Sequence, residues 1–290
     1  MPFLFDKEAE IRMHKTAIYK TNHRPNQVQI RRSGRSFHLS LRQILILCSA
    51  AFLLFMTVWI SMVLIGHALI DERKLAAYRH PDSMPVQGMD APIPRDYVHL
   101  NEMPDYLRNA FVAIEDHRFE NHIGIDPIAL ARSLWVDLVQ GHKAQGGSTI
   151  TMQLARNMFL TNEKTFDRKW KEMLISVYLE QRFSKDEILE MYLNNIYFGH
   201  GIYGIEGAAS YYFNKTVRYG SNDKPLINLS EAAILASLPK APESYSPVRN
   251  WDKAKARQQL VLRRMNDLGY ISQDQRESAI GQQVFIKPAS

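Results

Sequence analysis

Two adjacent carboxylates at the end of a short apolar segment are the strongest candidates for chemistry in this sequence. Glu115 and Asp116 directly follow the apolar residues 110–114, and Arg118 and His122 lie close behind. The apolar segment should carry Glu115 close to the core, where a carboxylate is expensive unless it is used or paired. Burial raises a carboxyl pKa and makes the group a better general base. We therefore predict Glu115 as a catalytic base; an ordinary solvated acidic pair at a helix end is the alternative.

A glycine pair, Gly146-Gly147, precedes a second predicted helix start at Ser148. Small residues there leave backbone N–H groups able to face an anion, although a flexible lead-in to an ordinary helix cap is the alternative. Five cations follow within sixteen residues: Arg156, Lys164, Arg168, Lys169 and Lys171. Their spacing places Lys164, Arg168, Lys171 and the carboxylate Glu172 on one helix face. Such a cluster is usually a solvated face, but beside an anion-binding loop it favours a phosphate or pyrophosphate site.

Residues 199–204 fit the G-x-G-x-x-G pattern of dinucleotide-binding proteins. They follow a helical segment rather than a strand, and no βαβ pattern surrounds them. A loop that needs close approach of the backbone is the better interpretation.

The elements that must position these groups are mostly helices. Asp126 followed by Pro127 is typical of a helix start, and Gly269 is typical of a helix end. Residues 184–187 have the spacing of a capping box. The candidate N-caps are Asp126, Ser148, Ser184 and Ser230, which precede helices predicted at 128–139, 149–160, 185–196 and 231–238, and a further amphipathic helix covers 251–268. Period-2 patterns are confined to short segments near 95–100 and 283–287, so we predict a mainly α domain.

The segment Ile44–Gly66 contains 23 residues without a charge. As a helix it would reach about 34 Å, enough for a hydrocarbon core of about 30 Å, whereas a buried core helix rarely has such a long uncharged run. Arg31, Arg32, Arg35 and Arg42 precede it closely, and the charges cancel after it. Residues 1–42 are therefore predicted as a cytoplasmic basic arm and residues 43–70 as a transmembrane helix. Five prolines predict a stalk and the start of the outer domain over 71–104, which leaves 105–290 as the main domain.

The charge distribution excludes a nucleic-acid partner for the main domain. Residues 1–42 carry nine basic and three acidic side chains, whereas residues 71–290 carry 27 of each sign. The main domain therefore has no long-range attraction for polyanions, and the arm is expected to meet anionic lipid headgroups. A single cysteine, Cys48, excludes an internal disulfide framework and a zinc site built from several thiolates.

Four ordered motifs between residues 95 and 270 resemble those of the family 51 peptidoglycan glycosyltransferases. They are Glu115-Asp-His-Arg-Phe with His122 and Gly124, Gly146-Gly-Ser-Thr-Ile-Thr, Arg168-Lys-Trp-Lys-Glu172, and Lys185-Asp-Glu-Ile-Leu-Glu-Met-Tyr-Leu-Asn194. One membrane span followed by this domain resembles the monofunctional biosynthetic transglycosylases. The resemblance implies a mainly α, lysozyme-like two-lobed glycosyltransferase domain, with a head and a membrane-proximal jaw, behind one N-terminal transmembrane helix.

The resemblance also implies an activity and a location. The protein would polymerise lipid II into β-1,4-linked peptidoglycan glycan strands by inverting glycosyl transfer, releasing undecaprenyl diphosphate. It would cross the bacterial cytoplasmic (inner) membrane once, with the N-terminus in the cytoplasm and the catalytic domain in the periplasm or outside the cell. The implied partners are lipid II, the growing glycan strand, membrane lipid and cell-wall synthesis proteins, and no nucleic acid.

Individual site residues follow from the same resemblance. Glu115 matches the family's general base and Glu172 its second essential carboxylate. The positions that match pyrophosphate contacts or donor-site support are Ser148, Gln153, Arg156, Lys164, Arg168 and Lys171. Some family members use a divalent cation at the pyrophosphate, so Mg²⁺ or Mn²⁺ is a possible cofactor and no metal ligand is assigned. Met152 stands where the family usually has Gln, Arg156 where many members have Lys, and Lys164 where many have Arg.

Two alternatives belong to other functional classes. A hydrolase or lytic enzyme on the same fold would also use paired carboxylates, but it needs no dense group of cations. A non-catalytic membrane scaffold would need neither Glu115 nor Glu172. The cations beside Glu172 therefore favour glycosyl transfer, with Glu115 accepting the proton of the acceptor's 4-hydroxyl.

Overall fold

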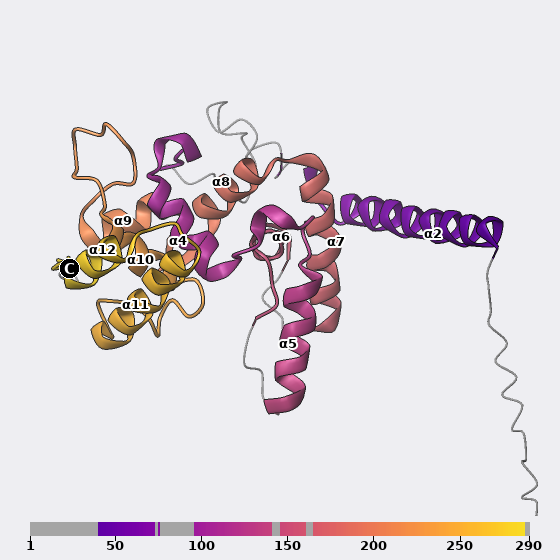
Figure 1. Ribbon diagram of the computed structural model, residues 1–290. Coiled ribbons are helices and arrows are strands. Elements are labelled where there is room, and N and C mark those ends of the chain that lie inside the picture. The colour runs from indigo at the N-terminus through magenta and orange to yellow at the C-terminus, as the bar shows by residue number, and fades with distance from the viewer. Residues whose placement is uncertain (1–39, 73–74, 76–95, 141–145, 161–164, 288–290) are drawn as a thin grey trace, which may run out of the picture. The chain divides into compact units, whose positions relative to one another are not determined.

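The computed structural model describes residues 40–72, 75, 96–140, 146–160 and 165–287 (Figure 1). Helices make up most of these residues, so the predicted mainly α class is confirmed. The basic arm before residue 40, most of the proline-rich segment and Lys164 lie outside the described residues.

Helix α2 (Leu41–Ala68) contains the predicted membrane span. Its 28 residues have a mean hydropathy of 2.4 over their most apolar window, and none of that window is buried. At 1.5 Å per residue the helix is about 42 Å long. Among the described residues it is the helix that is long and apolar enough to cross a membrane.

Three helices, α4 (Asp105–Glu115), α11 (Trp251–Asp267) and α12 (Gln273–Gly281), pack around α10 (Leu229–Ser237), in which eight residues from Ser230 to Ser237 are buried. Helices α4 and α11 both pack on α10 and on each other, and α12 packs on α11 (Figure 1). Because apolar residues line one face of α4, its last residue, Glu115, lies at the edge of this core.

Three consecutive helices form the second group: α6 (Ile150–Phe159), α7 (Phe166–Arg182) and α8 (Lys185–Asn195). Ser184 closes the predicted capping box of α8 with Glu187. Helix α5 (Pro127–Gln140) starts where Asp126 accepts hydrogen bonds from the amides of Ile128 and Ala129, as predicted. The other described helical elements are η1 (Leu100–Glu102), η2 (Phe119–Asn121) and α9 (Ile205–Phe213).

Two predicted caps are wrong by one or two residues. Thr149, not Ser148, caps α6, because its hydroxyl accepts from the amide of Met152. Asn228, not Ser230, caps α10 in a capping box with Glu231. In each case the predicted serine is occupied elsewhere: Lys169 donates to Ser148, and Gln258 donates to Ser230.

The predicted strands near 95–100 and 283–287 are wrong in the part that the structure describes. Val98 exchanges its backbone hydrogen bonds with the side chain of Asn194, and the amide of Leu100 donates to Glu190, so side chains replace a ladder. The end of the predicted stalk is also packed, since Val98, Leu100 and Met103 are buried in the core. The two observed strands, β1 (Tyr197–Gly199) and β2 (Ile202–Tyr203), form a short antiparallel hairpin within the glycine-rich segment.

Candidate active site

Glu115 ends α4 and faces the start of α6. The amide of Gln153 donates from Nε2 to Glu115 Oε2 at 2.8 Å. Tyr192 of α8, which is fully buried, donates in turn to Oε1 of Gln153 at 3.2 Å. Because Tyr192 occupies the amide oxygen, the NH₂ group of Gln153 is held toward Glu115.

Opposing effects set the proton affinity of Glu115. Burial raises its pKa above the ordinary carboxyl value, and this is the largest effect. The Gln153 hydrogen bond and the positive charges of Arg257, Lys240 and Arg156 lower the pKa in part. A carboxylate with a raised pKa is suited to accept a proton near neutral pH, so the structure supports the predicted environment of Glu115.

Glu172 lies in a different environment. It is fully buried in α7, yet both of its carboxylate oxygens meet cations: Arg168 donates to Oε1, and Lys169 Nζ lies 3.1 Å from Oε2. Lys169 Nζ also donates to the hydroxyl of Ser148 at 2.6 Å, and burial lowers the pKa of Lys169 while Glu172 opposes that effect. Lys169 thus links Ser148, which follows the Gly146-Gly147 pair, to the carboxylate of Glu172.

The structure divides the predicted cations. Arg168 and Arg156 belong to the site: Arg156 affects the pKa of both Glu115 and Lys169, so its charge reaches both sides. Lys171 forms its ion pair with Asp167 at 2.6 Å on an exposed surface of α7. Lys164 lies outside the described residues.

Sequence reasoning did not assign four residues that the structure places at the site. Lys169 is in the predicted basic cluster, but its role depends on the orientation of α7. Tyr192 lies inside the fourth sequence motif, and no other feature of the sequence pointed to it. Arg257, which lies over the ring of Tyr245 at 5.1 Å, and Lys240 come from distant segments with no local motif.

Met152, which stands where the resembled family usually has Gln, makes no polar contribution to the site. Its side chain is 1% exposed, so it fills an apolar position in α6 next to Gln153. Of Met152 and Gln153, only Gln153 makes a polar contact with Glu115.

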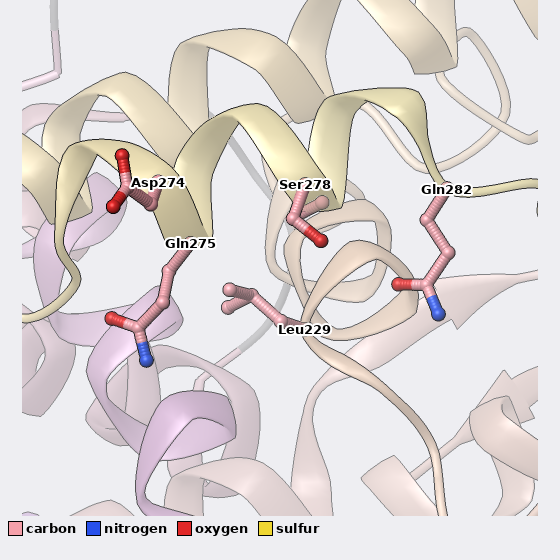
Figure 2. A pocket seen from close by; sticks show the side chains of 6 residues that line it. Leu229, Asp274, Gln275, Ser278 and Gln282 are labelled. Atoms are coloured by element: carbon pink, nitrogen blue, oxygen red, sulfur yellow. The ribbon is translucent and has the colours of Figure 1, made fainter.

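The described residues do not fit a resident metal site. They contain no group of three or more His, Cys, Asp or Glu side chains that could hold a metal ion, and the oxygens of Glu172 already meet Arg168 and Lys169. A groove between Leu229 and α12 has a volume of about 340 Å³. Figure 2 shows the side chains that line it. The groove is lined by Leu229, Asp274, Gln275, Ser278, Ala279 and Gln282, so it offers no cation for a pyrophosphate and contains none of the predicted site residues.

Comparison with known proteins identifies the family of the chain. The chain is 46% identical over 242 residues to penicillin-binding protein 1F of Bacillus subtilis (strain 168), covering 82% of this chain and 33% of that protein. It is 48% identical over 178 residues to penicillin-binding protein 1A of Escherichia coli (strain K12), covering 61% of this chain and 20% of that protein. The chain thus spans a third or less of the length of these relatives.

A crystal structure of penicillin-binding protein 1A from Haemophilus influenzae matches 67% of this chain and 18% of that one, with 24% identity and a TM-score of 0.38. A family model described as Transglycosylase matches residues 83–266. The chain therefore belongs to the transglycosylase family, which confirms the resemblance to the family 51 peptidoglycan glycosyltransferases.

Proposed function

We propose that this member of the transglycosylase family polymerises lipid II into β-1,4-linked peptidoglycan glycan strands with inversion at the anomeric carbon, releasing undecaprenyl diphosphate. The observation that carries the proposal is the contrast between its two carboxylates. Glu115 meets one neutral amide and has a raised pKa, whereas Glu172 is buried between Arg168 and Lys169. Two carboxylates in such different environments are suited to different roles.

Glu115 acts as the general base in this reaction. It accepts the proton of the 4-hydroxyl of the acceptor's GlcNAc while that oxygen attacks the anomeric carbon of the donor chain. The C–O bond to the pyrophosphate breaks as the new glycosidic bond forms, so the configuration inverts. Gln153 keeps one oxygen of Glu115 oriented throughout.

The pyrophosphate leaves on the side of Glu172. Ser148, Arg156, Arg168 and Lys169 are proposed to stabilise the negative charge that grows on it. Glu172 holds Arg168 and Lys169 in place and limits their mutual repulsion. Lys164 remains a proposed contact from the sequence alone. Lys171, which the sequence also predicts as a contact, pairs with the exposed Asp167, so the proposal does not depend on it. A divalent cation at the pyrophosphate remains a proposal for which the described side chains provide no ready-made site.

A membrane location supports this chemistry, because donor and acceptor both carry polyprenyl chains. We propose that α2 crosses the cytoplasmic membrane once and places the catalytic domain outside. Exposed apolar side chains also occur on α5 and at the start of α7, which supports contact of this part of the domain with membrane lipid; they are Ile128, Trp135, Leu138, Val139, Phe166 and Trp170. Contact with other cell-wall synthesis proteins is proposed on functional grounds only.

The test is turnover of the purified full-length chain with fluorescent lipid II in detergent. The expected products are long glycan polymer, which a muramidase digests, and one undecaprenyl diphosphate for each bond formed. A chain that shortened preformed glycan without extending lipid II would be a hydrolase. A folded chain with neither activity would be a scaffold, and either result would overturn the proposal.

A further inference from the structure

Asp116 has no role in the reaction described above, yet it is one of the most closely bound groups near Glu115. It is 6% exposed, and its Oδ2 accepts two hydrogen bonds. One comes from Nε2 of His122 at 2.8 Å and the other from the amide of Ile150 at 3.0 Å. Ile150 is the first residue of α6, so Asp116 ties the end of α4 to the start of α6 and meets the positive end of that helix.

The hydrogen bonds of His122 define the tautomer of its ring. The amide of Gly124 donates to Nδ1 at 3.2 Å, so Nδ1 carries a lone pair and the proton of the neutral ring is on Nε2, where it is donated to Asp116. His122 therefore acts as a fixed donor to Asp116.

The loop that carries His122 is itself tightly held. Gly124 has a φ of +95°, and a Cβ at this position would lie 2.6 Å from the carbonyl oxygen of Ser176 in α7. The carbonyl oxygen of Gly124 accepts from the hydroxyl of Thr149 at 2.6 Å, and Thr149 caps α6. The loop thus fixes the start of α6 against both α4 and α7.

The consequence for the base follows from helix geometry. Gln153 lies three residues after Ile150, about 4.5 Å further along the axis of α6. Glu115 and Asp116 are adjacent in the chain, and each receives a hydrogen bond from α6: Glu115 from Gln153, and Asp116 from Ile150. A shift of α6 that lengthened the bond from Ile150 would also move Gln153 relative to Glu115.

We propose that Asp116 and His122 are a pair of positioning residues that hold α6 in the register at which Gln153 donates to Glu115. They act through Gln153 and touch neither substrate. The inference rests on the proposed function, since it assigns a role to the two residues in setting the base of that reaction.

The pH dependence of turnover distinguishes this role from a purely structural one. The base must be ionised, so the acid limb of kcat/KM follows the pKa of Glu115. Loss of the Gln153 hydrogen bond removes an effect that lowers this pKa, so the limb must move to higher pH. The other charged or titratable groups that act on Glu115 or respond to it are Arg156 of α6, Tyr192 of α8, Lys240 and Arg257 of α11, and all of them are kept in every variant.

The experiment compares full-length variants with lipid II between pH 5 and 9. His122→Leu, which removes the donor, and Gln153→Met, which removes the contact directly, should each move the acid limb up by about one pH unit. The double variant should move it no further than Gln153→Met alone, because both changes remove the same hydrogen bond. In His122→Gln, which can still donate to Asp116, the acid limb should stay close to its wild-type position.

Two results would overturn the inference. One is a limb in His122→Leu that stays at the wild-type position while thermal stability falls; the other is a double variant whose shift is the sum of the two single shifts. If His122→Leu does not fold, His122→Phe replaces it. His122→Phe keeps a ring of similar shape, leaves the charge of Asp116 in place and removes the hydrogen bond from Nε2, and an unmoved limb there would count equally against the pair.

A measurement without turnover separates this inference from the proposed function. In the ¹⁵N spectrum of protein labelled on histidine, His122, assigned by its loss in His122→Gln, should show the Nε2–H tautomer across neutral pH. An Nδ1–H tautomer, which leaves no proton on Nε2 for Asp116, would refute the positioning pair even in an active enzyme. Conversely, the expected tautomer in a wild-type chain that fails to extend lipid II would leave the geometry standing and overturn only the function.

Discussion

Replacing Lys169 by Met tests which lysine of α7 serves the pyrophosphate side of the site. The substitution keeps the length of the side chain and removes only its charge and its hydrogen bonds to Ser148 and Glu172. Lys171→Met is the matched control, because Lys171 lies on the same helix and pairs with the exposed Asp167.

The structure allows the stability that each of the two variants should lose to be compared. At 3.1 Å and an effective dielectric constant of about 20, the Lys169–Glu172 attraction is about 5 kcal/mol before the cost of desolvation. Lys169 is a third exposed and Arg168 still pairs with Glu172, so we expect a net loss of about 2 kcal/mol. That corresponds to roughly thirtyfold in an equilibrium constant. The exposed pair of Lys171 should contribute about 0.4 kcal/mol.

Both variants are measured in two assays. Urea unfolding at pH 7 gives the stability, and initial rates over a range of lipid II concentrations give kcat and KM. Lys169→Met should be less stable by about 2 kcal/mol and should lose at least thirtyfold in kcat/KM, since the departing pyrophosphate also loses a cation. Lys171→Met should lower the stability by only about 0.4 kcal/mol and should change kcat/KM by less than about twofold.

Equal losses in the two variants, or a larger loss in Lys171→Met, would refute this reasoning. The second outcome would instead support the contact that the spacing of Lys164, Arg168 and Lys171 predicts. An unchanged kcat/KM in Lys169→Met, with only stability reduced, would show that Lys169 holds Glu172 but does not meet the donor.

Three further predictions follow from the site, the fold and the sequence. Glu115→Gln should lower polymerisation by about 10²-fold. Because burial raises the pKa of Glu115, the variant should match the wild type in stability below the ordinary carboxyl pKa and become more stable than it as the pH rises through the raised pKa. Urea unfolding at pH 4 and pH 8 that showed no such gain would contradict the assignment. Gly124→Ala should destabilise the fold by about 3 kcal/mol, against about 1 kcal/mol for Gly220→Ala, since both glycines have positive φ but only at Gly124 does a Cβ meet backbone; equal urea midpoints would exclude the close contact with α7. A reporter that is active only outside the cytoplasm should work after Ser290 and fail within residues 1–40, and the reverse result would refute the predicted topology.

Local signals were sufficient for most helices. Asp126 with Pro127, the capping box at Ser184 and Gly269 each satisfy backbone groups within one turn of themselves, so their role is readable without knowledge of the rest of the chain. The hairpin at 197–203 was missed because its strands are too short for a period-2 pattern and its turn relies on the positive φ of His200 and Gly201. The caps at Thr149 and Asn228 were misplaced because Ser148 and Ser230, which could also cap, are held by Lys169 and Gln258.

The sequence by itself determined that this chain has one long apolar helix, a mainly α domain and two carboxylates in family motifs, because periodicity, helix caps and motif spacing are local properties. Only the tertiary structure decided how those carboxylates differ. Glu115 is set by Gln153 and by charges from helices far along the chain, and Glu172 by the direction in which α7 presents Lys169. The physical reason is that the proton affinity of a buried carboxylate depends on every charge and dipole within a few ångströms, and packing, not spacing in the sequence, brings those groups together.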